Sequence, residues 1–468
     1  MLHFAIDRHV VRRTCHSMTQ TLPASSAATT DPSHARYRSL FCSLIWPRYP
    51  GHSGGEIRDF HLVRHLASLS DVEFFALHDV PGEGQEDRLA AHVRARHDPR
   101  TIASSRPDLV QAERYPAKVL DRVVRRLRRA RVPVPGPRYH FDVEMQLVNA
   151  RTWSLGALQE ALGRSAPDFL FVSPQVNPVA LLLPDGARTR LVMASYDVER
   201  VRMERFAAAA RGLAALAMRW EAARASRFEA DNLRRYDGVI AVSELDRQHY
   251  LRDYGFPEER VLVLENGVDP EYFAFAERTR AEPPLVVYVG NLRYPPNADA
   301  AVRLARGIMP IVWRSRPDAQ AVIVGDGPPP EVEAEARPGR VVVTGRVDDV
   351  RPYLARAWVG CVPLLAGSGT KYKVLEALAA GVPLVCSPLA VEGLDVEAGQ
   401  HLAVGASDDD LAREVVRLLG DAEAARALAH RGRQRVEERY AWDVNLPRLS
   451  GWLEWLRREP PRAGSRKP

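Results

Sequence analysis

Short apolar runs of strand length recur along the chain, and segments with helical periodicity separate them. We expect strands in the runs that are rich in Val, Ile, Leu and Phe, namely 37–45, 72–77, 168–172, 190–194, 237–242, 261–264, 285–289, 320–324, 340–344, 358–365 and 382–386. The alternation of strands with helices is typical of parallel sheets covered by helices. The predicted fold class is therefore α/β, with doubly wound, Rossmann-like sheets. A polar helix is expected over 85–96.

The length of 468 residues exceeds what one hydrophobic core usually serves, so two domains are expected. We place a first domain over 37–268 and a second over 269–440, followed by an aromatic-rich helix and tail in 441–468. Residues 1–36 lack the apolar core of a secretory signal and are expected to form a disordered extension.

Composition indicates a soluble globular protein, with 46% hydrophobic and 26% charged residues. No apolar run approaches the roughly 18 residues that a membrane span needs. The net charge of +6 permits phosphate ligands, anionic lipid or nucleic acid as partners. Cys361 and Cys386 fall inside predicted strands, so buried, reduced thiols and a cytoplasmic location are expected.

A glycine-containing turn in 367–383 precedes a helix expected to start near Thr370. Backbone amides at a helix N-terminus favour an anion, and two lysines add positive charge there. Glu376 shares their helix face. A diphosphate at the turn and a hydroxyl-bearing sugar at Glu376 would fit this segment. The candidate binding residues are Gly367, Ser368, Gly369, Thr370, Lys371, Lys373 and Glu376.

Two further positions follow predicted strands. Gly54 and Gly55 open a helix after the strand 37–45, and either an anion or sugar cradle or a plain tight turn explains them. Asp197 follows the strand 190–194, where ligands of parallel sheets collect. Binding of a sugar hydroxyl and capping of a helix that begins near Glu199 explain Asp197 equally well. Asp408, by contrast, opens a helix with two further aspartates and indicates N-terminal helix charge.

The stretch 363–383 and the string 265–269, Glu-Asn-Gly-Val-Asp, resemble signatures of retaining glycosyltransferases with the GT-B fold, of the family 4 type. The resemblance covers roughly 37–457 and fits a branch with a Gly-Ser-Gly loop. It implies two Rossmann-like domains that face each other across a cleft, with a last helix that returns to the first domain. Glu376 matches the glutamate that holds the nucleotide ribose, whereas Ser368 stands in place of the family's first glutamate.

The resemblance also implies roles for residues elsewhere in the chain. Many relatives clamp the diphosphate with an Arg and a Lys where this chain has Asn291 and Pro296, so Arg293, Lys371 and Lys373 are expected to supply the charge. Asp197 would bind a sugar hydroxyl. The remaining donor contacts are expected from Gly54, Gly55, Arg346, Val347 and Glu392.

The expected activity is transfer of a sugar from a UDP- or GDP-sugar to a carbohydrate or lipid-linked acceptor in the synthesis of cell-surface or exopolysaccharide glycoconjugates. Retention, no metal and no cofactor are expected. A basic amphipathic helix within 117–131 is either a solvated face or a peripheral contact with the anionic inner face of the membrane. No nucleic-acid partner is expected. A nucleotide-sugar epimerase on the same fold, or a non-catalytic relative that binds a polyanion through 122–131, is the alternative.

Overall fold

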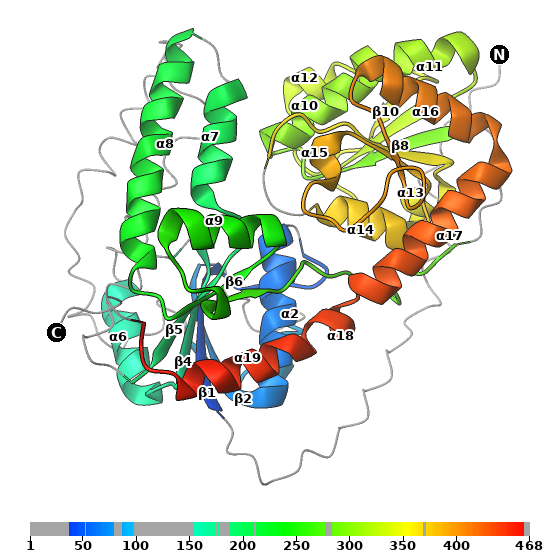
Figure 1. Cartoon of the computed structure of the whole chain (residues 1–468). Helices are drawn as coiled ribbons and strands as arrows, with labels where there is room; N and C mark the ends of the chain where they lie inside the picture. Colours follow the sequence, from blue (N-terminus) through cyan, green and yellow to red (C-terminus); the bar gives the residue numbers. More distant parts are fainter. Residues whose placement is uncertain are drawn as a thin grey trace. The chain divides into compact units, whose positions relative to one another are not determined.

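The computed structural model describes residues 37–51, 53–78, 87–97, 154–174, 176, 188–209, 212–276, 283–367 and 371–462. Two parallel sheets form within these residues (Figure 1). The predicted strand runs 190–194, 285–289 and 320–324 are confirmed to the residue. The basic segment 117–131 and the extension 1–36 lie outside the described residues.

The first sheet has the strand order β3-β2-β1-β4-β5-β6-β7. Its strands are β1 (Tyr37–Ile45), β2 (Ser70–His78), β3 (Ala95–His97), β4 (Phe169–Val172), β5 (Arg190–Ala194), β6 (Gly238–Ala241) and β7 (Val261–Val263). The helices of this part are α2 (Gly54–Leu69), η1 (Ala90–His92), α6 (Ser154–Ser165), α7 (Glu199–Ala209), α8 (Gly212–Leu233), α9 (Glu244–Tyr254) and η4 (Glu258–Arg260). The order of the strands reverses between β1 and β4, which is the switch point where doubly wound sheets bind ligands.

The second sheet has the order β10-β9-β8-β11-β12-β13 and reverses between β8 and β11. Its strands are β8 (Leu285–Val289), β9 (Gln320–Val324), β10 (Val341–Val343), β11 (Val359–Val362), β12 (Leu384–Cys386) and β13 (Ala403–Val404). The helices are α10 (Pro295–Arg303), the π-helical turn η5 (Leu304–Ile308), α11 (Met309–Ser315), α12 (Pro330–Glu333), α13 (Arg351–Arg356), α14 (Tyr372–Ala379), α15 (Pro388–Val391), α16 (Asp408–Gly420) and α17 (Ala422–Arg439). The predicted α/β fold with two doubly wound sheets is confirmed.

Two last helices return to the first sheet. Helices α18 (Trp442–Asn445) and α19 (Pro447–Arg458) lie beside β1, β2 and α2 in Figure 1. Leu449, Leu453 and Leu456 share a buried cluster with Phe41 and Phe74 of the first sheet. We call the first sheet with α2 to α9, α18 and α19 the first lobe, and the second sheet with α10 to α17 the second lobe.

The chain crosses between the lobes twice, and the two crossings touch. The amide of Val268 donates to the carbonyl of Tyr440 at 2.8 Å, and the amide of Trp442 donates to the carbonyl of Val268 at 3.3 Å. Gly267 lacks a side chain where the Trp442 indole lies, since a Cβ there would be 2.5 Å from the ring. The crossings therefore pack as one unit.

The prediction of a polar helix over 85–96 is wrong for the described part of that segment. Only the short turn η1 is helical, and Ala95–His97 forms the edge strand β3, whose residues pair with Glu73 to Phe75 of β2. The ring of His97 bonds the Glu73 carboxyl at 2.7 Å. Pairing with a neighbouring strand thus outweighed the local helical pattern.

The structure also bears on expectations about the cysteines, Asp408 and membrane-spanning helices. Cys361 and Cys386 are buried free thiols, as predicted. Asp408 starts α16, in which Ser407 and Asp410 form a capping box, so the expected helix-end charge is confirmed. Of the helices within the described ranges, none has the length and apolar character needed to cross a bilayer.

Candidate functional site

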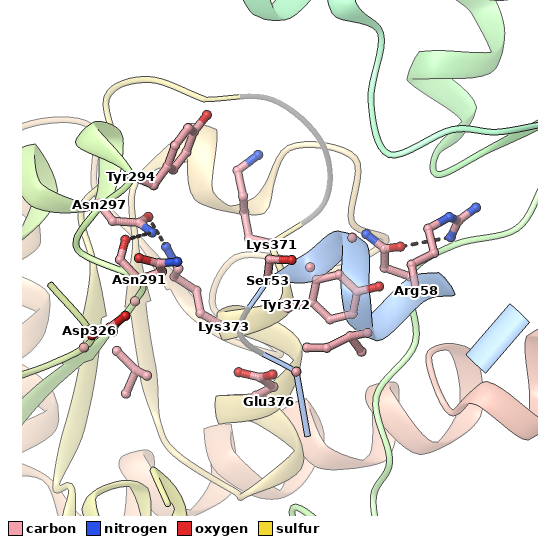
Figure 2. A pocket seen from close by; sticks show the side chains of 18 of the residues that line it. Ser53, Arg58, Asn291, Tyr294, Asn297, Asp326, Lys371, Tyr372, Lys373 and Glu376 are labelled. Carbon is pink, nitrogen blue, oxygen red and sulfur yellow. Dashed lines mark hydrogen bonds between the residues drawn. The ribbon is translucent and has the colours of Figure 1, made fainter. Parts of the chain in front are cut away.

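A cavity of about 840 Å³ lies where the loops at the carboxyl ends of both sheets meet. Its walls include residues after β1, β4 and β5 of the first lobe and after β8, β9, β10 and β11 of the second. Both switch points therefore open into one space, which is where ligands of doubly wound sheets bind. Figure 2 shows side chains that line it.

Helix α14 brings Lys371, Lys373 and Glu376 to the cavity wall, as their spacing predicted. Lys371 is the N-cap residue of α14, and its side chain is buried. In Figure 2 the Lys373 side chain extends toward Asn297, whereas the Lys371 ammonium takes a different direction. The two cations therefore serve different parts of the same wall.

Asn297 holds Lys373 in place, a contact that the sequence analysis missed. The Lys373 ammonium donates to Asn297 Oδ1 and, at 3.3 Å, to the Tyr288 hydroxyl. Asn297 Nδ2 donates in turn to the Asn291 carbonyl at 2.8 Å. The only sequence signal was a polar amide in the first turn of a helix that follows a strand, which is common in exposed positions as well.

Burial moves the ionisable groups of this wall toward neutral pH. It raises the pKa of Glu376 to about 7, against a lowering effect of the Lys373 charge. Burial, and then Lys371, lowers the pKa of Lys373 to about 7, with Glu376 opposing. Burial likewise lowers the pKa of Lys371 to about 8. An anionic ligand would favour the charged lysines, because an opposite charge stabilises the ionised form.

The opposite wall is built on the start of α2. Ser53 caps this helix, and its side chain accepts a hydrogen bond from the Glu56 amide. Gly54 and Gly55 line the cavity, where the Tyr372 ring of α14 and the Tyr196 ring cover them. A Cβ on Gly54 would lie 2.8 Å from Tyr372 Cδ2, and one on Gly55 2.9 Å from Tyr196 Cε2. The glycine pair therefore admits two aromatic rings, one from each lobe.

A buried network fixes Tyr196. Its hydroxyl donates to Asp59 Oδ2 at 2.6 Å, and the Ser43 hydroxyl donates to the same oxygen at 2.7 Å. Burial raises the pKa of Asp59 to about 7, although both hydrogen bonds lower it. Asp59 was not singled out from the sequence.

Asp197 lines the cavity, and its carboxyl lies 3.8 Å from the Arg202 guanidinium. Glu229 of α8 accepts hydrogen bonds from the first amides of α7, those of Glu199 at 3.1 Å and Arg200 at 3.0 Å. These two helix-end amides are therefore satisfied by a residue that lies later in the chain.

Arg293 and Glu392 do not line the cavity, in contrast to their expected roles. The Arg293 side chain is 68% exposed and pairs with Asp326 at 3.0 Å. Glu392 pairs with Arg205 of α7. Arg293 is paired within the second lobe, whereas the partner of Glu392 belongs to the first lobe.

The remaining predicted contacts divide by position. Gly367, Arg346 and Val347 line the cavity. Gly345 and Gly367 adopt positive φ angles of 66° and 117°, which favour glycine. Ser368, Gly369 and Thr370 lie outside the described residues. Across the described ranges, no group of His, Cys, Asp and Glu side chains is arranged to hold a metal ion.

Two family models match the chain. Residues 87–272 match the model described as Glycosyltransferase Family 4, and residues 283–421 match the one described as Glycosyl transferases group 1. Together they span most of both lobes.

Curated relatives include mycobacterial mannosyltransferases. The phosphatidyl-myo-inositol mannosyltransferase of Mycolicibacterium smegmatis is 32% identical over 218 residues, which is 44% of this chain and 54% of that protein. The GDP-mannose-dependent alpha-(1-6)-phosphatidylinositol monomannoside mannosyltransferase of Mycobacterium tuberculosis is 29% identical over 327 residues, or 59% and 82% of the two chains. The match to the first relative thus spans about half of its length.

Solved structures share the fold. A sucrose-phosphate synthase from Thermosynechococcus elongatus has a TM-score of 0.65 at 17% identity, covering 90% of this chain and 99% of that one. Anabaena HepE in complex with UDP and glucose has a TM-score of 0.61 at 13% identity, covering 90% and 100%. Two Rossmann-like lobes that share one cavity form the GT-B fold, and both matching family models describe glycosyltransferases. Within that class of enzymes the chain belongs to the family 4 type.

Proposed function

We propose that this protein transfers a sugar from a nucleoside-diphosphate sugar to a carbohydrate or lipid-linked acceptor. The observation that carries the proposal is the convergence of Lys371, Lys373 and Glu376 on a cavity whose other wall belongs to the first lobe. Two cations and a carboxyl on one helix suit a diphosphate joined to a ribose.

Each wall residue has a role in the proposal. Lys371 and Lys373 bind the diphosphate, and the turn before α14 adds backbone donors. Glu376 accepts hydrogen bonds from the ribose hydroxyls. The base lies against 345–347, where Gly345 turns the backbone. Asp197 binds a hydroxyl of the donor or acceptor sugar from the first lobe.

We infer that transfer proceeds with retention and without a metal. The acceptor oxygen forms a bond to the anomeric carbon on the face from which the diphosphate leaves, and the bond from that carbon to the phosphate oxygen breaks. The acceptor proton passes to the departing diphosphate. The lysines stabilise the charge that develops on the leaving group, which is the work a metal does in other transferases.

GDP-mannose is the first donor to test, because the names of the tuberculosis relatives specify it. UDP-sugars come next, since the complex of Anabaena HepE holds UDP. The synthesis of cell-surface glycoconjugates, at the cytoplasmic side of the membrane, is the setting that we propose.

The test is a thermal-shift panel of UDP, GDP, ADP and their sugars with the wild type, Glu376→Ala and the control Glu438→Ala on the exposed face of α17. One diphosphate should raise the melting temperature of the wild type and the control but not of Glu376→Ala. Transfer assays with the selected donor, with and without EDTA, then test the chemistry. Conversion of the donor sugar without an acceptor would favour an epimerase. Salt-steep binding of polyanions without any nucleotide response would contradict the proposal.

A further inference from the structure

One arginine of the first lobe reaches Gly367 of the second lobe. Gly367 is the first residue of the glycine-containing turn before α14, which we call the donor turn. Arg205 of α7 donates through Nη1 to the carbonyl of Gly367 at 3.0 Å and through Nη2 to Glu392 Oε1 at 2.9 Å. Its Nη1 also lies 2.6 Å from Glu392 Oε2. The guanidinium therefore binds a backbone carbonyl and a carboxylate at the same time.

The carbonyl that Arg205 binds belongs to the residue from which the donor turn starts. Gly367 lines the cavity with a φ of 117°, a conformation that residues with a side chain avoid. Glycine has no side chain to restrict its backbone, so it loses more conformational entropy than other residues when it is held in one conformation. An external hydrogen bond to its carbonyl compensates for that loss and fixes the orientation of the Gly367 peptide at the cavity wall.

Glu392 has a second effect through its pairing. Its charge raises the pKa of Lys371, whereas the charge of Arg205 lowers it. A Glu392 carboxylate that is held by Arg205 offers less attraction to the Lys371 ammonium. Lys371 is then more available to an anion in the cavity.

We propose that Arg205 is a positioning residue for donor binding, through which the first lobe fixes Gly367 at the cavity wall of the second. The role rests on the proposed function, since it assumes that a nucleoside diphosphate binds at this turn. Glu392 acts as the counter-charge that orients the guanidinium, in place of the direct donor contact expected from the sequence.

An ordinary ion pair would behave differently. Partly exposed pairs contribute about 0–1 kcal/mol to stability and tolerate exchange of Arg for Lys. A lysine has one ammonium without a planar fork, so it cannot hold the Gly367 carbonyl and both Glu392 oxygens in this geometry. A positioning role therefore predicts that Lys fails to replace Arg.

The experiment measures the dissociation constant of the diphosphate selected by the thermal-shift panel, by calorimetry, for full-length Arg205→Ala, Arg205→Lys and Glu392→Gln. Arg200→Ala is the matched control, because Arg200 lies on the same helix and pairs with Glu204 and Asp253 of its own lobe. Arg205→Ala and Arg205→Lys should each raise the dissociation constant about tenfold, a typical loss for a hydrogen bond to a charged group. Glu392→Gln should raise it less, and the double variant Arg205→Ala, Glu392→Gln should match Arg205→Ala alone.

Ligand-free melting temperatures separate positioning from folding. All variants should melt near the wild type, so that the loss is confined to ligand binding. Unchanged diphosphate binding by Arg205→Ala, or full binding by Arg205→Lys, would overturn the inference while the proposed function stands. A wild type that binds none of the tested diphosphates would overturn the proposed function and this role together.

Discussion

Alanine at Gly54 is expected to push the two walls of the cavity apart. The new methyl carbon would lie 2.8 Å from Cδ2 and 2.9 Å from Cε2 of Tyr372, closer than carbon atoms approach in packed proteins. Tyr372 is the first residue of α14 and lies between Lys371 and Lys373, so we expect a displacement of its ring to be passed to the helix. Either α14 shifts with both lysines, or the lobes move apart.

The cost follows from overpacking of a buried contact, about 1–3 kcal/mol. The clash joins residues of different lobes, so the strain falls on the arrangement that forms the cavity and not on the core of either lobe. The loss should therefore appear as weaker donor binding, by a factor of roughly 5 to 150. The unfolding of the lobes should change little.

The assay compares donor binding and urea unfolding of Gly54→Ala with those of Gly451→Ala. Gly451 lies inside α19 with open space around its Cβ position, so alanine there should be neutral or stabilise the helix by up to about 1 kcal/mol. A double-mutant cycle with Tyr372→Ala identifies the cause. If Gly54→Ala costs as much binding in the Tyr372→Ala background as in the wild type, the steric explanation is refuted.

Two further changes test the interior. Burial raises the pKa of Asp59 to about 7 in the folded protein, above the ordinary carboxyl value of 3.8. Between these two pH values the folded state keeps a proton that the unfolded chain releases. The free energy of unfolding should therefore fall as the pH rises from 3.8 to 7. Asp59→Asn should flatten that dependence by about 3 kcal/mol in urea unfolding between pH 4.5 and 7.5, and parallel profiles for variant and wild type would contradict it. Gly267→Ala places a methyl 2.5 Å from the Trp442 ring and should lower the free energy of unfolding by about 1–3 kcal/mol, whereas Gly420→Ala, which has open space, should not. An unchanged urea midpoint for Gly267→Ala would show that the two crossings can accommodate a methyl group at this position, contrary to the prediction.

Local pattern was enough to locate most of the strands. A buried parallel strand is apolar on both faces, so β5, β8 and β9 appear as short continuous apolar runs with clear ends. The edge strand β3 has no such run, and its residues Ala, Arg and His carry no strand signal. What makes it a strand is the row of free backbone groups on β2, which only the folded sheet presents.

The same difference separates the site residues that were predicted from those that were missed. Lys371, Lys373 and Glu376 lie within two turns of one helix, so spacing alone placed them on one wall. Arg205 and Gly367 are 162 positions apart, and Asn297 and Lys373 are 76 apart. Contacts at such separations depend on how the sheets bring loops together, which periodicity does not encode. Arg293 was favoured because it was near in sequence, yet Asp326 binds it instead.

Two contacts near the donor turn join the two lobes. Tyr372 of α14 packs on Gly54 of α2, and Arg205 of α7 binds Gly367 before α14. Gly367 and Tyr372 are therefore contacted from the first lobe, while Lys373 is held by Asn297 and Tyr288 of the second. Movement of the lobes would release Gly367 and Tyr372 before it disturbed Lys373. Donor binding and approach of the lobes should accordingly favour each other, since each stabilises the arrangement that the other requires.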